Sequence, residues 1–161
     1  MTQENLTVNK SLKVSKKEIL DDFLLMNVSR NISYIGRKEV FMGRAKFGVF
    51  GDGKELPQIA MSKFFRNGDF RSGYYRDQTF MMSINQLTPD QFFAQLYAHT
   101  DIKKDPHSGG RQMNCHFGTR LLNENGDWKT QTDMMNSVSD ISCVSGQMPR
   151  IVGLAYASKL Y

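Results

Sequence analysis

The sequence predicts a mainly helical chain with little or no β-sheet. Two segments carry the start signals of an α-helix, because a capping-box pair is followed by apolar residues at helical spacing. No stretch has the alternating pattern or the short apolar run of a convincing buried strand. Residues 100–146 are rich in Gly, Asn, Asp and Ser, a composition typical of irregular structure.

The first expected helix covers residues 16–34. Residues 1–14 are polar and aperiodic, and we expect a flexible tail there. Ser15 and Glu18 have the capping-box spacing, and Gly36 is the expected stop. The apolar residues that recur at helical spacing in this segment are Ile19, Leu20, Phe23, Leu24 and Val28.

A glycine-rich loop (43–53) separates this helix from a second one, expected from Lys54 to Phe65. Its expected buried residues are Ile59, Met61, Phe64 and Phe65. Asn67 and Gly68 then turn the chain, and residues 68–82, rich in aromatics and arginine, show no clean period.

The third helix has the clearest start. Thr88 is the expected cap, Pro89 the first helical residue, and Gln91 completes the capping box. After the irregular stretch 100–146, residues 147–161 predict a last helix with Pro149 near its start. That helix reaches Tyr161 without a stop signal, so we expect the sequence to continue in the intact protein.

Composition limits the class of protein. The chain has 161 residues, the size of one domain, with 40% hydrophobic and 23% charged residues, which indicates neither disorder nor a fibre. The net charge of +5 permits an anionic partner, but no dense Lys/Arg block with interleaved aromatics favours nucleic acid.

Cysteine use and hydropathy favour a cytoplasmic protein. Cys115 and Cys143 form neither a CxxC pair nor a ligand cluster, so we expect reduced thiols. The first thirty residues carry neither the apolar stretch nor the cleavage site of a signal peptide, and no run approaches the roughly 18 apolar residues of a membrane span. No membrane partner is expected.

Three segments, taken together, point to one family: SGYYRDQTFM (72–81), GGRQMNCHFGT (109–119) and SDISCVSGQMPRIVGLAYASKL (139–160). Their order and spacing resemble the alpha part of the decarboxylating component of branched-chain 2-oxo acid dehydrogenases (the 2-oxoisovalerate dehydrogenase type). Residues 41–58 further resemble the form in which alpha and beta parts are fused in one chain. The resemblance implies that residues 15–161 are the amino-terminal, incomplete portion of an α/β thiamine-diphosphate-binding (transketolase-like) domain, truncated before most of its sheet.

The resemblance also implies an activity. Members decarboxylate a 2-oxo acid and transfer the acyl group to lipoamide on the acyltransferase core of the complex. The cofactors are thiamine diphosphate and Mg²⁺, bound between the alpha part and a beta part that supplies the activating carboxylate. The implied partners are therefore the beta part, separate or fused, the lipoyl acyltransferase core and the 2-oxo acid. An isolated alpha fragment is expected to be inactive.

Carried over from the family, Tyr75 and Arg76 are expected to bind the diphosphate. Arginine offers a rigid fork of donors to phosphate oxygens, and a phenol adds one more hydrogen bond. The alternative is a surface arginine in a salt bridge beside a core tyrosine. Backbone groups around Ser142 and Val144 are expected at the aminopyrimidine ring, unless Ser142 is only a loop or capping serine. Ile141 and Cys143 depart from the family's potassium-binding pattern, and no potassium is assigned.

His116 falls where the family places a histidine near the reacting carbon. An imidazole there can donate to the substrate carboxylate or move a proton. The alternative is a structural, hydrogen-bonded histidine. Asn114 stands where relatives commonly have proline.

The Gly51-Asp52-Gly53 triplet resembles the start of the family's magnesium-binding fingerprint but lacks the following asparagine pair. We expect a turn whose Asp52 caps the next helix. No metal ligand is assigned in this chain, and the Mg²⁺ ligands are expected after Tyr161. A competing hypothesis is a small basic nucleic-acid-binding protein that uses the aromatic and arginine-rich residues 64–77.

Overall fold

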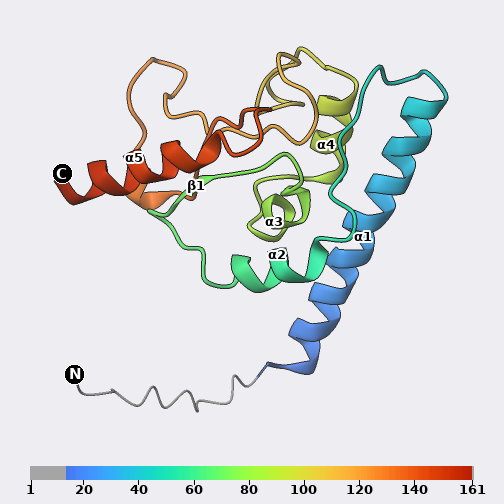
Figure 1. Ribbon diagram of the computed structural model, residues 1–161, viewed down its shortest axis with the longest axis horizontal. Helices are drawn as coiled ribbons and strands as arrows, with labels where there is room; N and C mark the ends of the chain where they lie inside the picture. The colour runs from blue at the N-terminus through green and yellow to red at the C-terminus, as the bar shows by residue number, and fades with distance from the viewer. Residues whose placement is uncertain (1–13, 161) are drawn as a thin grey trace.

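The computed structural model describes residues 14–160 (Figure 1), so nearly all of the expected tail at 1–14 lies outside the described residues. The structure is mainly helical, as predicted, with one small two-stranded sheet. The helices are α1 (Lys16–Phe41), α2 (Glu55–Ser62), α3 (Gln78–Ser83), α4 (Pro89–Leu96) and α5 (Gln147–Leu160), with a 3₁₀ turn at Gln131–Asp133. The strands are β1 (Phe70–Ser72) and β2 (Asn136–Val138).

Helix α1 begins as predicted but ends later. The Ser15 hydroxyl accepts the Glu18 N–H, which satisfies a free donor of the first turn. The predicted stop at Gly36 is wrong, because α1 continues to Phe41. A Cβ at Gly36 would lie 2.4 Å from the Phe50 ring, so this glycine gives the following loop room to pack against the helix.

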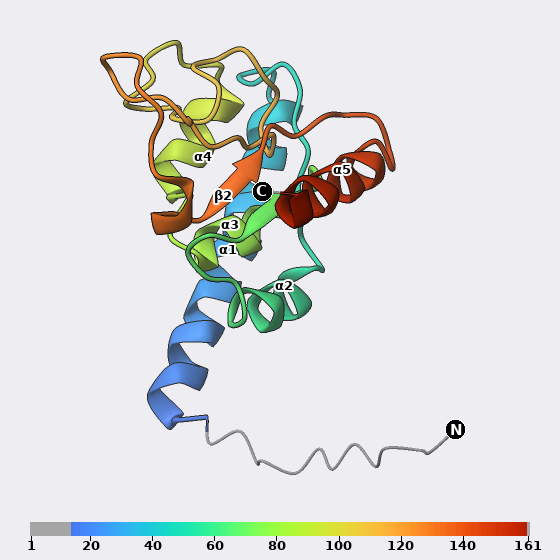
Figure 2. The ribbon, with the colours of Figure 1, turned by 90° about the vertical axis from the view of Figure 1, so that its left-hand side faces the viewer.

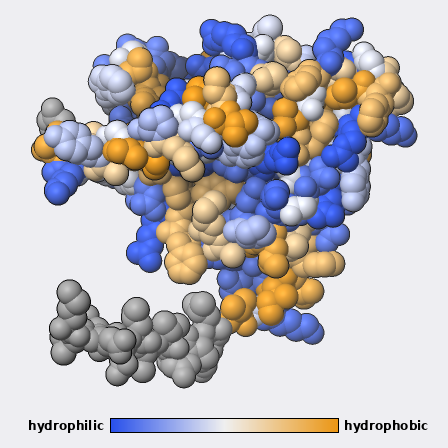
Figure 3. All heavy atoms as spheres, viewed as in Figure 1, coloured by the Kyte–Doolittle hydropathy of each residue, from blue (hydrophilic) through white to orange (hydrophobic). Residues whose placement is uncertain are grey.

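The apolar residues in the first half of α1 do not face the core. Each of Ile19, Leu20, Phe23 and Leu24 is more than half exposed. Figure 3 shows hydrophobic side chains gathered at this end of the molecule. The buried face lies further along the helix and is formed by Ser29, Ile32, Ser33, Gly36 and Glu39.

The core lies where α2, α3 and α4 pack against the second half of α1, and Figures 1 and 2 show α3 in the middle of this group. The most completely buried large side chains include Phe80, Met81, Phe92 and Phe117. Helix α3 was not predicted. Its position depends on Gln78, whose amide donates to the Ser29 carbonyl and the Ser33 hydroxyl of α1.

Helix α2 is shorter than predicted, and its expected burial is only partly right. Ile59 is buried and Phe65 is half-buried, but Met61 and Phe64 are exposed. The helix ends at Ser62, so Phe64 lies beyond it and outside the core.

Asp52 does not cap α2, contrary to the prediction. Lys54 is the N-cap residue and provides no side-chain cap bond. The Asp52 carboxylate instead forms an ion pair with Arg37 at 2.7 Å, and the Glu55 carboxylate accepts the Gly53 N–H.

The two strands are parallel and pair Phe70 with Asn136, Arg71 with Ser137 and Ser72 with Val138. Three residues are too few for a recognisable sequence pattern, and β2 lies inside the stretch expected to be irregular. Because the pairing is parallel, residues 73–77 and 139–142 leave the sheet at the same edge. Two of the family motif segments are thereby brought side by side.

Helix α5 covers the predicted span and contacts β1, and none of its residues is buried. Figures 1 and 2 show it along the outside of the sheet. Between residues 14 and 160, no helix is both long and apolar enough to cross a membrane.

Candidate functional site

Backbone hydrogen bonds join the second motif segment to the third. The Thr119 N–H donates to the Ser137 carbonyl at 2.9 Å, and the Asp140 N–H donates to the Phe117 carbonyl at 2.8 Å. His116 therefore lies beside the residues that follow β2, at the same edge as the turn that carries Tyr75 and Arg76.

The His116 ring is the centre of this cluster and is only 2% exposed. Its Nε2 lies 2.8 Å from the Ser142 hydroxyl, and its Nδ1 lies 3.2 Å from the Asn114 carbonyl. A carbonyl can only accept, so in the neutral ring Nδ1 carries the proton and Nε2 accepts from Ser142. The Tyr75 ring stacks on His116 at a 14° interplanar angle, with 6.4 Å between centroids.

Tyr75, which is half-buried, and Arg76, which is exposed, form the rim of the cluster. The Tyr74 hydroxyl donates to the Tyr75 hydroxyl, and the Arg76 guanidinium lies 5.7 Å from the Tyr75 ring centroid. Arg76 is exposed and forms no ion pair within residues 14–160. The expected alternative for Arg76, a surface salt bridge, is therefore not found in this part of the chain.

The backbone beneath Arg76 is closely held. The Gln58 amide donates to the Arg76 carbonyl at 2.8 Å. A Cβ at Gly51 would lie 2.4 Å from that same carbonyl oxygen, so the glycine permits close backbone contact. The Gly51-Asp52-Gly53 turn thus supports the Arg76 segment structurally.

Val144 is the one predicted residue that does not join the cluster. It lies in the turn that leads into α5, and it is 70% exposed. The contacts therefore bring together Tyr75, Arg76, His116 and Ser142, while Val144 remains two residues away along the same turn as Ser142.

The loop before His116 is fixed by Asn114. Its side chain donates to the Val49 carbonyl at 2.5 Å and accepts the Val49 N–H at 2.9 Å. A proline at this position would have no polar side chain to make either bond. The adjacent Cys115 is fully buried, and burial raises the pKa of its thiol, which removes it from thiolate chemistry.

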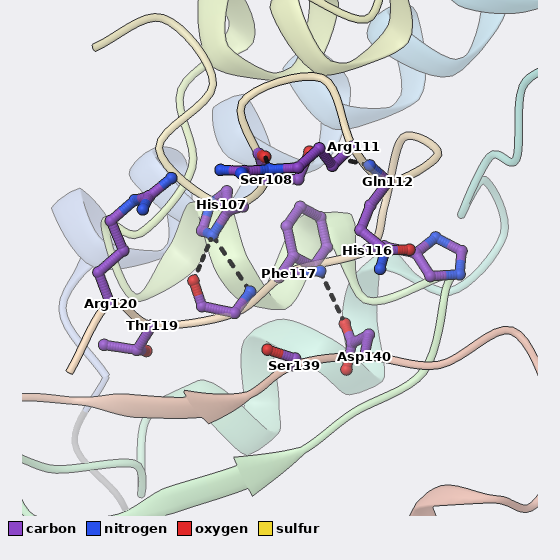
Figure 4. Close-up of a pocket in the computed structure, with 11 residues that line it drawn as sticks. His107, Ser108, Arg111, Gln112, His116, Phe117, Thr119, Arg120, Ser139 and Asp140 are labelled. Carbon is purple, nitrogen blue, oxygen red and sulfur yellow. Dashed lines mark hydrogen bonds between the residues drawn. The ribbon is translucent and has the colours of Figure 1, made fainter. Parts of the chain in front are cut away.

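A polar cavity of about 350 Å³ lies between residues 107–120 and residues 139–140 (Figure 4). His116 also lines this cavity, and Figure 4 shows its ring turned away from the other labelled lining residues. His107 lines the cavity, and its Nε2 lies 2.9 Å from the Gln86 carbonyl. Burial lowers the pKa of His107, which favours the neutral ring.

Three charged residues, two of them buried and Asp77 half-buried, were missed in the sequence. They are Arg71, Asp77 and Asp140, and Arg71 forms ion pairs with both carboxylates. In the sequence, Arg71 directly precedes the first motif segment, Asp77 lies in the first segment and Asp140 lies in the third. Only the fold reveals that these charges meet.

Residues 25–159 match the model of the family described as "Dehydrogenase E1 component". The chain belongs to the dehydrogenase E1 component family. The matched range contains Tyr75, Arg76, His116, Ser142 and Val144, so the whole predicted site lies in the E1 region.

One curated E1 relative is the 2-oxoisovalerate dehydrogenase subunit alpha of Bacillus subtilis (strain 168). It is 26% identical to this chain over 153 residues, which cover 94% of the chain and 41% of the relative. The chain thus spans about two-fifths of the relative's length. This match confirms the likeness to an E1 alpha subunit that the motif segments predicted.

The cluster fits the anionic end of the cofactor expected for an E1 chain. Within residues 14–160 the Arg76 guanidinium has no ion-pair partner, and together with the Tyr75 phenol beside it this is a donor set that suits a diphosphate. No group of three or more His, Cys, Asp or Glu side chains within residues 14–160 could hold a metal ion.

Proposed function

We propose that this E1 chain is part of the thiamine-diphosphate-dependent decarboxylating component of a 2-oxo acid dehydrogenase, within an α/β thiamine-diphosphate-binding fold. One observation carries the proposal. Tyr75, Arg76, His116 and Ser142 come from three separate motif segments and meet in one cluster.

Arg76 and Tyr75 hold the diphosphate in this proposal. The guanidinium is exposed and has no carboxylate partner within residues 14–160, so it is available for a bidentate contact with phosphate oxygens. The Tyr75 hydroxyl, next to that of Tyr74, adds a donor at the same rim. The Mg²⁺ ligands are contributed by residues outside this chain.

His116 acts beside the reacting carbon, and the backbone around Ser142 and Val144 faces the aminopyrimidine. When bound, thiamine diphosphate supplies the carbanion-stabilising chemistry of decarboxylation. The chain's own residues orient the substrate and handle protons. With Nδ1–H directed to the Asn114 carbonyl, Nε2 is the nitrogen that can take up a proton and then donate to a substrate carboxylate.

The substrate in this proposal is a branched-chain 2-oxo acid, and the acyl group passes to lipoamide on an acyltransferase core. The name of the Bacillus relative supports the substrate class. The beta part, separate or fused, contributes the activating carboxylate. Cys115 and Cys143 are free cysteines, as expected for a protein that functions in the reducing cytoplasm.

The competing nucleic-acid function for residues 64–77 has less support. Arg71, in the middle of that stretch, is 7% exposed and paired with two carboxylates, so it is not available to phosphates. Arg66 and Arg76 remain as the exposed arginines of the stretch, which is fewer than the dense basic patch typical of nucleic-acid binding.

The test is decarboxylation by the full-length protein with 2-oxoisovalerate or pyruvate, thiamine diphosphate, Mg²⁺ and a redox dye. We expect turnover with 2-oxoisovalerate to exceed turnover with pyruvate. His116→Asn should lower kcat by about 10²-fold or more, as expected for loss of a proton-transfer group, without weakening cofactor binding. The control is His99→Asn, because His99 is exposed and outside the cluster. No decarboxylation of any 2-oxo acid would refute the proposed function.

A further inference from the structure

The guanidinium of Arg71 contacts residues of all three motif segments, namely Asp77, Phe117 and Asp140. Arg71 lies on β1, and one of its terminal nitrogens donates to the Ser137 hydroxyl of β2 at 2.5 Å. The other terminal nitrogen donates to the Asp77 and Asp140 carboxylates, each at 2.9 Å. The Phe117 ring lies 5.6 Å from the guanidinium.

Each of the two carboxylates also accepts a hydrogen bond from a backbone N–H close to a site residue. The Asp77 oxygen bound by Arg71 also accepts the Tyr74 N–H at 2.9 Å, which closes the turn that carries Tyr75 and Arg76. The Asp140 oxygen bound by Arg71 also accepts the Phe117 N–H at 3.0 Å, next to His116. Asp140 itself lies two residues before Ser142.

Burial of these three charges has a large desolvation cost. The side chains of Arg71, Asp77 and Asp140 are 6%, 18% and 0% exposed, and two carboxylates share one guanidinium. Removing such ions from water costs several kcal/mol each, and apolar residues of similar size often stabilise a core equally well. The second oxygen of Asp140 has no hydrogen-bond partner within the described chain. Stability alone therefore gives a weak reason for these charges.

The geometry favours arginine specifically. Its planar fork reaches Ser137, Asp77 and Asp140 at once, whereas a lysine ammonium offers one centre on a flexible stem. Gly73 keeps the space open, because a Cβ there would lie 1.7 Å from the Arg71 guanidinium.

We propose that Arg71 is a positioning residue that sets Arg76 and Tyr75 against His116 and Ser142 without touching the cofactor. This inference rests on the proposed function for the meaning of the site. Its geometric part, that one guanidinium couples the three segments, can be tested separately.

The test uses Arg71→Lys in the full-length protein, with Arg44→Lys as the matched control. Arg44 also pairs with a carboxylate through two nitrogens, but its partner is Glu39 at the end of α1. Calorimetry with thiamine diphosphate and Mg²⁺, well below the melting temperature, measures the affinity. We expect Arg71→Lys to weaken binding by about tenfold or more, and Arg44→Lys to change it less than twofold.

A double-mutant cycle separates positioning from general weakening of the fold. If Arg71 acts through Arg76, most of the Arg71→Lys effect should disappear in the Arg76→Ala background. A full tenfold effect in that background would overturn the inference. So would unchanged affinity accompanied by a lower melting temperature.

Hydrogen exchange of the cofactor-free protein tests the coupling without any cofactor. In Arg71→Lys, peptides with the Tyr74 and Phe117 amides should both exchange faster, while peptides of α4 keep their rate. Asp140→Asn provides a milder variant if Arg71→Lys fails to fold. Unchanged exchange at both amides would overturn the inference. Wild-type protein that does not bind thiamine diphosphate would overturn the proposed function instead, and the exchange result would still decide the role of Arg71.

Discussion

Replacing Arg76 with alanine should separate cofactor binding from stability. The guanidinium is exposed, makes no ion pair within residues 14–160, and lies over the Tyr75 ring at 5.7 Å. A cation–π contact at an exposed site contributes about 0.5–1 kcal/mol at most, so the cofactor-free protein should melt almost as the wild type does. Arg76→Ala should instead lower the affinity for thiamine diphosphate.

The magnitude follows from the diphosphate contact. A hydrogen bond to a charged group contributes about 1.5–3 kcal/mol, and 1.4 kcal/mol is a factor of ten. Arg76→Ala should therefore weaken thiamine diphosphate binding by about tenfold to a few hundredfold. Arg76→Lys should restore only part of this affinity, because lysine keeps the positive charge but lacks the planar pair of donors of the guanidinium.

The assay is calorimetric titration of the full-length variants with thiamine diphosphate and Mg²⁺, beside thermal melts without cofactor. Arg66→Ala is the matched control, since Arg66 is an exposed arginine of the same region outside the cluster. If Arg76→Ala kept its affinity and lost melting temperature, Arg76 would be a structural residue and the assignment would be wrong.

Three further predictions concern the isolated chain, pH and backbone packing. The isolated chain should not decarboxylate 2-oxoisovalerate in the dye assay even with thiamine diphosphate and Mg²⁺; clear turnover would contradict the need for residues outside it. Burial lowers the pKa of His107, so the unfolded chain binds its proton at higher pH than the folded chain. Unfolding free energy of the full-length protein should thus be retained above about pH 6.5 and fall below it, by at most about 1.4 kcal/mol per pH unit from this group. In His107→Gln, chemical unfolding at several pH values should show a shallower fall, and an unchanged slope would refute the assignment. Gly51→Ala should cost about 1–3 kcal/mol in chemical unfolding, because its Cβ would meet the Arg76 carbonyl. Gly153→Ala, in α5 with open space, should stabilise by up to about 1 kcal/mol, and equal effects of the two changes would refute this reasoning.

Local signals in the sequence predicted where helices begin. Thr88 and Gln91 form both bonds of the expected capping box, and of the pair expected for Ser15 and Glu18 the structure shows the bond from the Glu18 N–H to the Ser15 hydroxyl. These bonds depend only on neighbouring residues. The predicted end of α1 was wrong because Gly36 makes room for the Phe50 ring, fourteen residues further along the chain, and does not end the helix. A glycine read locally indicates a stop, but here it serves a tertiary contact.

The short elements could not be predicted because their stability comes from distant residues. Helix α3 has no side-chain cap bond, and Gln78 ties it to α1 across more than forty residues. Strands β1 and β2 are three residues each and are paired across more than sixty residues. Neither case leaves a periodic pattern.

The candidate site was predicted as residue identities, through a family resemblance, but not as an arrangement. That resemblance named Tyr75, Arg76, His116, Ser142 and Val144, and the fold brings the first four together while Val144 stays outside the cluster. The roles of these residues remain predictions. Arg71 and its two carboxylates were missed, because three charges that meet in the folded chain look in the sequence like three separate solvated charges.

The most direct test of the account is a structure of the full-length protein with thiamine diphosphate and Mg²⁺. We expect diphosphate oxygens within about 3 Å of the Arg76 guanidinium and the Tyr75 hydroxyl, with His116 Nε2 directed toward the reacting carbon. A diphosphate held by other residues, with Arg76 left in solvent, would contradict the account.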